Sequence, residues 1–377
     1  MSDFNSSGRV GCLDGLRGLA ALWVLIGHAH LLTGFKVPVI GDPDLGVDLF
    51  IMLSGFLMVF HYQRRKGREP WEAKSTWITF WVRRYFRIAP LYYAMLIAAL
   101  TLGPFVYDAR MVIDAFNGVR PQLADRYLDS SLANYIAHLT FLFGLSRHYA
   151  YRTALPDWSI GLEMQFYAAL PFIMMVVGRF GWVKGVVGVA AVGGAIAYFL
   201  HRTGYTFPMP TFLPLKLHIF AAGMLLAGAL WTTKKRTYLF SGIAGLLVLV
   251  PVGGDMDALH HAMRIILVLT FFALIHTERL PYAAAKMMRP VSEWLGKGFF
   301  HNLGELSFGA YLIHLLVMQP VVAYLIKTTD INDPTRWALT LLITVPIVYG
   351  LAWVGYKFIE MPGQSIGREL TKPRVSA

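Results

Sequence analysis

Residues 13–30 read LDGLRGLAALWVLIGHAH, an apolar run with Asp14 and Arg17 near one end and His28 and His30 near the other. A helix needs about 20 mostly apolar residues to cross the roughly 30 Å hydrocarbon core of a bilayer. Ionisable side chains inside that core cost several kcal/mol unless they are paired or hydrated. The segment is therefore expected to be a transmembrane helix with a functional polar face.

The composition of the whole chain indicates a membrane protein. Apolar residues make up 56% of its 377 residues and charged residues only 15%, with a mean hydropathy of +0.52; soluble domains average about 25% charged. The first apolar run shows no small-residue cleavage site, so we expect it to stay as a transmembrane helix. Cys12 is the only cysteine, which excludes an intramolecular disulfide and a Cys-rich metal site. No metal is expected.

Ten apolar runs are long enough to be interpreted as spans. They lie at 16–33, 47–62, 86–107, 158–178, 182–200, 214–231, 238–252, 263–277, 302–326 and 336–359. With the N-terminus inside, cytoplasmic segments hold 22 of the 34 Lys and Arg residues and external loops hold ten, as the positive-inside rule requires. We therefore predict one all-α domain over 1–377, a bundle of about ten transmembrane helices with both termini cytoplasmic.

Residues 133–146 form an eleventh apolar run. If this run crossed the membrane, every later loop would lie on the opposite side. The charge count disfavours that crossing, so this run is predicted to be re-entrant or interfacial within an external loop, 108–157. The net charge of +12 is explained by the cytoplasmic loops, and no nucleic-acid partner is expected.

The first predicted span carries Arg17 and His28 on one face. They are eleven residues apart, which separates them by about 20° around the helix and about 16 Å along it, with Arg17 near the cytoplasm and His28 in the outer half. Asp14 can pair with Arg17 at i−3. Glu163, at a depth similar to that of His28, could orient it as a general base. The alternatives are a snorkelling Arg17, a His28 bonded to a nearby carbonyl, and a Glu163 that only favours a helix start.

Other polar residues extend this pattern through the bundle. Arg84 and Arg87, at i and i+3 in RRYFRIAPLYY, suit phosphate groups of a cytosolic molecule, or else anchor lipid headgroups. Ser54, within LFIMLSGF, leaves room for close helix packing or a narrow channel. Tyr311 and His314 share a helix face, where packing alone is a sufficient explanation. The set favours either transfer of a group from a phosphorylated cytosolic donor to an outward-facing acceptor, or a proton-coupled transporter.

Six motifs in order along nearly the whole chain resemble the acyltransferase type 3 family of integral membrane acyltransferases. They are LDGLRGLAALWVLIGH, with its Arg-x10-His spacing, GVDLFIMLSGF, FWVRRYFRIAPLYY, DWSIGLEMQFY, LGELSFGAYLIH and YKFIEMPGQ. Some members of that family add an external SGNH-type hydrolase domain, whereas this chain is expected to be the stand-alone form.

The resemblance implies transfer of an acyl group, most often acetyl from acetyl-CoA, to a hydroxyl of a carbohydrate or lipid-linked acceptor. It further suggests exopolysaccharide or lipopolysaccharide modification at a bacterial inner membrane. The residues expected to act are His28, Glu163 and Arg17 in catalysis, Arg84, Arg87 and Ser54 toward the acyl-CoA donor, and Asp14, Trp158, Tyr311 and His314 toward the substrate. Whether His28 is a base for direct attack or is itself acylated stays open at this point.

Overall fold

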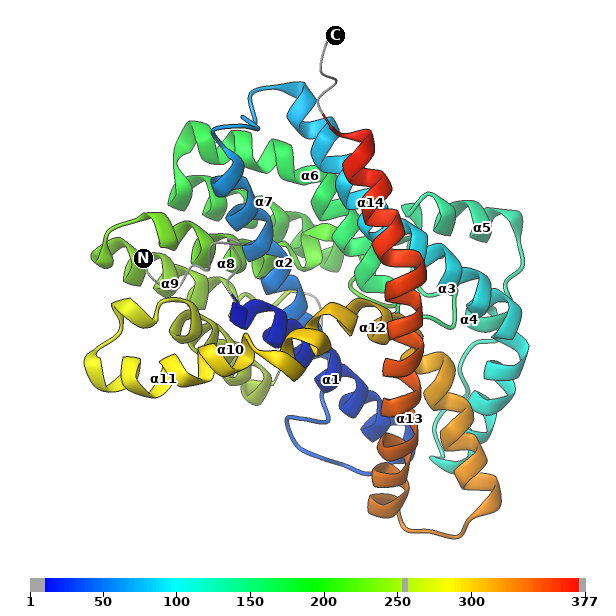
Figure 1. Ribbon diagram of the computed structural model, residues 1–377. Helices are drawn as coiled ribbons and strands as arrows, with labels where there is room; N and C mark the ends of the chain where they lie inside the picture. The colour runs from blue at the N-terminus through cyan, green and yellow to red at the C-terminus, as the bar shows by residue number, and fades with distance from the viewer. Residues whose placement is uncertain (1–10, 253–256, 373–377) are drawn as a thin grey trace.

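The structure is a computed structural model that describes residues 11–252 and 257–372. Its regular elements are all helical (Figure 1). The longer helices are α1 (Gly11–Thr33), α2 (Pro43–Arg65), α3 (Lys74–Phe116), α6 (Trp158–Phe180), α7 (Trp182–Arg202), α8 (Leu217–Gly228), α9 (Lys234–Leu247), α10 (Ala258–Ile275), α11 (Tyr282–Leu295), α12 (Gly298–Thr328), α13 (Asp333–Gly355) and α14 (Met361–Leu370). The all-α prediction is confirmed for the described residues.

Eight of the helices in the described ranges are long and apolar enough to cross a membrane: α1, α2, α3, α6, α7, α10, α12 and the continuous stretch from α13 to α14. Two predicted spans, 214–231 and 238–252, correspond to the shorter helices α8 and α9. Short 3₁₀ turns flank α8 on both sides, and every residue of α8 is buried. The protein is thus a multi-pass membrane protein. The chain ends, for which a cytoplasmic location is predicted, lie outside the described residues.

The predicted external loop begins later than the sequence pattern indicates. Helix α3 is 43 residues long, or about 65 Å at 1.5 Å per residue, so it extends well beyond the hydrocarbon core. The run 133–146 forms only α5 (Leu132–Leu139) and a 3₁₀ turn, Leu142–Leu145. An eight-residue helix is too short to cross a bilayer, which agrees with the prediction that this run does not span.

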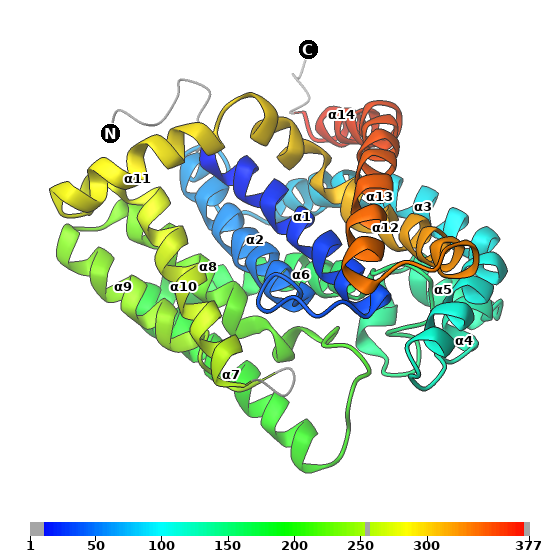
Figure 2. The ribbon, with the colours of Figure 1, turned by 90° about the horizontal axis from the view of Figure 1, so that it is seen from below.

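Close contact between backbones brings α2 against α8. A side chain at Gly55 would collide with the carbonyl oxygen of Phe220, and one at Gly223 would collide with that of Met52. Small residues allow helices to approach this closely in membranes. This contact places the adjacent Ser54 beside Phe220, and both line the same cavity. Figure 2 shows α1, α2, α8 and α10 running side by side in the bundle.

A buried charge cluster fixes α2, the start of α8 and α10 together. Asp48 on α2 accepts hydrogen bonds from Lys216 Nζ at 2.8 Å and Arg264 Nε at 2.6 Å, and all three side chains are at most 4% exposed. Mutual pairing is how charges are retained inside a bilayer. The cluster explains why Lys216 is tolerated within an otherwise apolar segment.

The external loop is fastened to the bundle through Asp157, the residue before α6. Its carboxylate accepts hydrogen bonds from Tyr92 at 3.2 Å and Thr153 at 2.9 Å, and His138 lies at 3.6 Å. Burial raises the pKa of Asp157, although His138 and these hydrogen bonds act in the opposite direction. The loop therefore packs as an ordered part of the protein.

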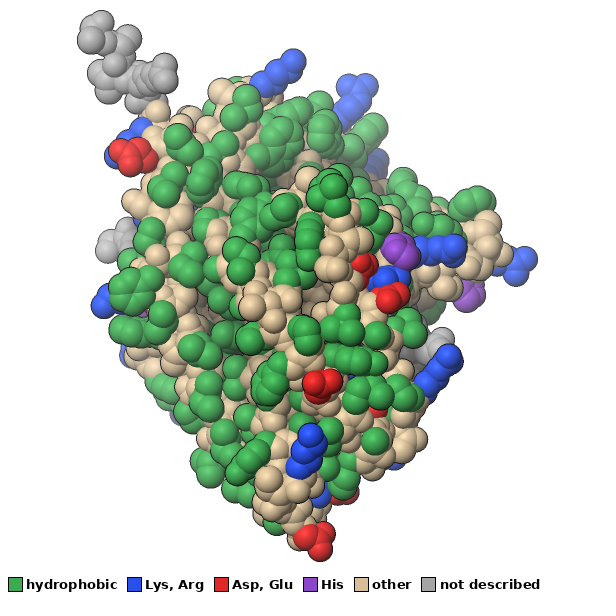
Figure 3. Space-filling view, turned by 90° about the vertical axis from the view of Figure 1, so that its right-hand side faces the viewer, with side chains coloured by type: hydrophobic (Ala, Val, Ile, Leu, Met, Phe, Trp, Pro, Cys, Tyr) green, Lys and Arg blue, Asp and Glu red, His purple; other side chains and the backbone are tan. Residues whose placement is uncertain are grey.

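The outer surface is suited to lipid. Figure 3 shows a face covered mainly by hydrophobic side chains, with few charged ones. Helix α13 alone exposes Leu342, Ile347, Leu351 and Trp353, as expected for a helix that contacts hydrocarbon.

Candidate active site

A chamber lined by arginines lies between α1, α2, α3, α12 and α14. Its volume is about 1,300 Å³, and the lining includes six arginines, Arg17, Arg65, Arg83, Arg84, Arg87 and Arg368, against two acidic side chains, Asp14 and Glu305. The structure thus brings the three predicted arginines, Arg17, Arg84 and Arg87, to one cavity. Arg17, Arg84 and Arg368 form no ion pair with any acidic side chain in the described ranges, so their charge is available to an anion.

Glu360 is a site residue that the sequence interpretation missed. It lies in a π-helical segment, Tyr356–Glu360, is 1% exposed and forms an ion pair with Arg87. Gln364 donates a second hydrogen bond to its carboxylate at 3.1 Å. π-helical segments often occur at functional sites, and the motif YKFIEMPGQ was the available signal.

Asp14 lines the chamber but does not pair with Arg17 as predicted. Its Oδ2 lies 3.2 Å from His301 Nδ1, and His301 Nε2 lies 3.6 Å from Glu305. Helix α12 approaches α1 closely here, since a side chain at Gly304 would collide with the backbone of Asp14. The carboxylate is therefore held by α12, while Arg17 is left to the cavity.

Toward the bundle centre the chamber adjoins a narrower hollow lined by Arg17, Arg84, Arg87, Ser54, Glu163 and Tyr167, among others. Glu163 accepts hydrogen bonds from Ser54 at 3.0 Å and from Tyr167. The Arg84 guanidinium lies 5.6 Å from the Tyr167 ring centre, within the range of a cation–π contact. Arg84 and Arg87, which are predicted to bind the donor, therefore share one hollow with the predicted catalytic acid, Glu163.

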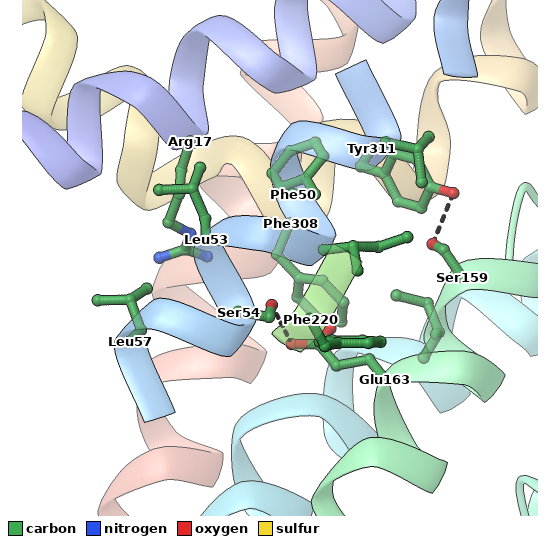
Figure 4. Close-up of a pocket in the computed structure, with 13 residues that line it drawn as sticks. Arg17, Phe50, Leu53, Ser54, Leu57, Ser159, Glu163, Phe220, Phe308 and Tyr311 are labelled. Carbon is green, nitrogen blue, oxygen red and sulfur yellow. Dashed lines mark hydrogen bonds between the residues drawn. The ribbon is translucent and has the colours of Figure 1, made fainter. Parts of the chain in front are cut away.

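A third hollow, of about 580 Å³, adjoins the hollow around Tyr167 and shares Arg17, Ser54 and Glu163 with it. Figure 4 shows the residues that line this third hollow. Its walls are mostly apolar, with Phe50, Phe220 and Phe308 among them. At its far side Ser159 donates a hydrogen bond to the hydroxyl of Tyr311 at 2.8 Å, and that hydroxyl donates to the Pro156 carbonyl at 2.6 Å. The three adjoining hollows extend from the arginines to Tyr311.

His28 is paired with another histidine. Nδ1 of His28 lies 3.2 Å from His314 Nε2, and the ring centres are 4.9 Å apart. The Tyr311 ring centre is 5.9 Å from that of His314. No hydrogen bond or ion pair joins His28 to Glu163 among the described residues, so the predicted direct pairing is wrong. Matched depth on two helices does not make them neighbours, and α12 rather than α6 packs on α1 here.

The contacts of the two histidines determine their tautomers. His314 Nδ1 lies 2.6 Å from the Tyr311 carbonyl oxygen, which can only accept, so this nitrogen is the donor. In neutral His314, Nε2 then accepts from His28 Nδ1–H, which also points to the Val24 carbonyl at 2.9 Å. Nε2 of His28 consequently carries a lone pair that can take up a proton. A bond from His28 to a nearby carbonyl was the alternative prediction to a role as a base. The bond to the Val24 carbonyl is present, but it uses Nδ1 and leaves Nε2 able to accept a proton.

Trp158, the other predicted substrate residue, is the first residue of α6 and is 5% exposed within the apolar core. It lines none of the four hollows described in this structure. Its position supports the start of α6, from which Ser159 and Glu163 point toward the cavity (Figure 4).

Comparison with known proteins now identifies the family. A family model described as an acyltransferase domain, Acyl_transf_3, matches residues 10–353. The chain belongs to the acyltransferase type 3 family. The resemblance inferred from the six motifs is confirmed, and this family assignment gives no support to the transporter alternative.

Several curated relatives are similar over long stretches. The peptidoglycan O-acetyltransferase OatA of Listeria monocytogenes is 23% identical over 93% of this chain and 55% of its own length. The putative membrane-bound transacylase BcsY of Komagataeibacter xylinus is 32% identical over 46% of this chain and 39% of its own. Nodulation protein 10 of Rhizobium leguminosarum is 26% identical over 100% and 99%. The chain thus spans about half or less of the first two relatives. No solved structure matches it significantly.

Proposed function

We propose that this acyltransferase type 3 protein is a membrane O-acyltransferase that moves an acyl group, acetyl in the simplest case, from acyl-CoA to a hydroxyl of a carbohydrate or lipid-linked acceptor. The observation that carries the proposal is the series of adjoining hollows from six arginines to Tyr311. Neither histidine lines these hollows, but the ring centre of Tyr311 lies 5.9 Å from that of His314. Cationic walls suit phosphates, and apolar walls suit an acyl group. Relatives named O-acetyltransferases support the same chemistry.

In this proposal the phosphates of the donor bind Arg84, Arg87 and Arg17, and the pantetheine arm follows the hollow past Ser54. The arm has to cover about 16 Å, the rise along α1 from Arg17 to His28. Glu163 keeps the narrow part polar through its bonds with Ser54 and Tyr167. Its role is thus to shape the donor path, not to orient His28.

At the inner end, Nε2 of His28 takes the proton of the acceptor hydroxyl as its oxygen attacks the thioester carbonyl carbon. The carbon–sulfur bond then breaks, and the thiolate of coenzyme A leaves with the proton that His28 Nε2 had taken up, which returns His28 to its neutral form. The positive charge that develops on His28 is stabilised by the hydrogen bond from Nδ1–H to His314 Nε2. No metal is needed in this sequence of steps.

The acceptor is expected at the outer ends of the helices, near the 108–157 segment, and the location is expected to be a bacterial inner membrane. A strain that lacks the protein, compared with its parent by mass spectrometry of surface carbohydrate, should lose ester-linked acetyl groups and regain them with the wild-type gene. Unchanged ester content in the deletion strain would contradict the proposal. A transporter would instead change substrate flux into sealed vesicles without forming an ester.

A further inference from the structure

A fourth hollow of about 460 Å³ opens beside the arginine chamber. It is formed by the end of α2, the connection over 66–73 and the start of α3, and it shares His61, Arg65, Arg83 and Arg84 with the chamber. The mechanism proposed above does not use this side pocket.

Three aromatic rings line the side pocket. The ring centres of Trp71 lie 5.4 Å from Tyr62 and 5.3 Å from Phe80, with interplanar angles of 69° and 57°. Trp71 is 6% exposed, and its carbonyl accepts a hydrogen bond from Trp77 Nε1 at 2.6 Å. Rings held in this way form a preorganised apolar surface for a flat ligand.

Polar groups lie at the edge of the same pocket. Glu69 accepts a hydrogen bond from Arg83 at 2.7 Å, and Arg83 is held from the other side by Thr371 at 2.9 Å. Glu69 and Thr76 line the pocket and offer hydrogen-bonding groups to a ligand's edge. The pocket therefore combines stacking faces with edge hydrogen bonding, the combination by which proteins hold nucleobases.

We propose that the side pocket binds the purine ring of a nucleotide-bearing acyl donor while the adjoining arginines hold its phosphates. The inference rests on the proposed function, because it assigns a position to the adenosine 3′,5′-bisphosphate part of coenzyme A. The shared residues Arg65, Arg83 and Arg84 place anion-binding groups next to the aromatic pocket, as a nucleotide requires. The pantetheine arm then leaves from the phosphates toward Ser54.

Binding of adenosine 3′,5′-bisphosphate to the purified full-length protein tests the inference directly. Tyr62→Leu removes one ring of the side pocket and should weaken binding about 10- to 100-fold, while binding of inorganic pyrophosphate, which needs only the arginines, stays within about twofold. The matched control is Phe172→Leu, since Phe172 is 55% exposed, packs on Trp77 and lines none of the four hollows. Calorimetry supplies all affinities, and Tyr62→Met replaces Tyr62→Leu if the latter fails to fold.

Unchanged nucleotide affinity in a folded side-pocket variant would overturn the inference, as would equal weakening of nucleotide and pyrophosphate. Kinetics provide a second test with acetyl-CoA and with S-acetyl phosphopantetheine, which lacks the nucleoside. Tyr62→Leu should raise KM for the first donor only, and an equal rise for both would also overturn the inference. A wild-type protein that binds the nucleotide but forms no ester would refute the proposed function and leave the purine site standing.

Discussion

The histidine pair gives the sharpest prediction about the proposed chemistry. His314→Leu removes the acceptor for His28 Nδ1–H, which now lies 3.2 Å from His314 Nε2. The Val24 carbonyl at 2.9 Å still accepts from the same proton, so the ring of His28 keeps its orientation. The substitution is therefore expected to reduce kcat with little effect on donor binding.

The size of the effect follows from the charge on His28. In the ground state the hydrogen bond between the two neutral rings contributes about 0.5–1.5 kcal/mol, whereas a bond to a charged group contributes about 1.5–3 kcal/mol. The transition state, in which His28 gains a proton, thus loses roughly 1–2 kcal/mol more than the ground state. At 1.36 kcal/mol per factor of ten, kcat should fall about 5- to 30-fold.

The assay follows ester formation by mass spectrometry, with purified protein, acetyl-CoA and a surface-carbohydrate fraction from a deletion strain as acceptor. His314→Gln serves as the rescue variant, because its side-chain oxygen can accept from His28 Nδ1–H and should restore most of the lost rate. A His314→Leu protein with wild-type kcat would refute the reasoning. An increase in donor KM at constant kcat would equally contradict a role exerted through His28.

Three further predictions concern the donor site, the helix packing and the external loop. Arg84→Gln should raise donor KM about tenfold and reduce its dependence on salt, since a phosphate-binding charge that forms no ion pair with the described acidic residues is lost; donor titrations at two salt concentrations measure this, and an unchanged KM would place the phosphates elsewhere. Gly55→Ala should destabilise the protein by about 1–3 kcal/mol because the new methyl collides with α8. Gly242→Ala, where the new methyl would meet no atom within 4 Å, should keep or slightly raise the melting temperature, since alanine favours a helix interior over glycine. Equal melting of the two variants would contradict the packing described. Burial raises the pKa of Asp157 in the folded protein above its value in the unfolded chain, which is about 3.9. The stability that the protonated carboxyl contributes to the fold is therefore complete below the unfolded pKa. It is lost as the pH rises through the folded pKa. Asp157→Asn should accordingly gain stability relative to wild type as the pH is raised above the unfolded value in thermal melts, and a relative loss would show that the carboxylate is stabilised, not strained, by its site.

Local spacing was sufficient to predict much of the site. The Arg-x10-His spacing assigned Arg17 and His28 to one face of a helix, and the i, i+3 spacing did the same for Arg84 and Arg87; the structure brings Arg17, Arg84 and Arg87 to one chamber. Ser54 also lines the path, because the small Gly55 beside it lets α8 approach. These inferences depend only on helix geometry, which the sequence determines within each segment.

Contacts between helices could not be predicted in the same way. Depth in the membrane placed Glu163 level with His28, but depth does not determine which helix packs opposite, and His314 of α12 occupies that position. Glu360 forms its ion pair with a residue far away in the sequence, Arg87, and no local pattern indicates such a partner. Hydropathy also predicted spans at 214–231 and 238–252. It measures only apolar content, so it does not distinguish a helix that faces lipid from one such as α8, which is buried inside the bundle.

In the proposed function, acetyl is transferred to an acceptor hydroxyl at His28, and isotope labelling of the product ester follows that step. Purified wild-type protein and His28→Ala, at matched amounts and confirmed to be folded, are incubated with ¹³C-acetyl-CoA and the carbohydrate acceptor, and ester-bound label is counted by mass spectrometry. Wild type should form labelled ester, and His28→Ala should form it at least about 100-fold more slowly. Equal labelling by the two proteins would contradict the account.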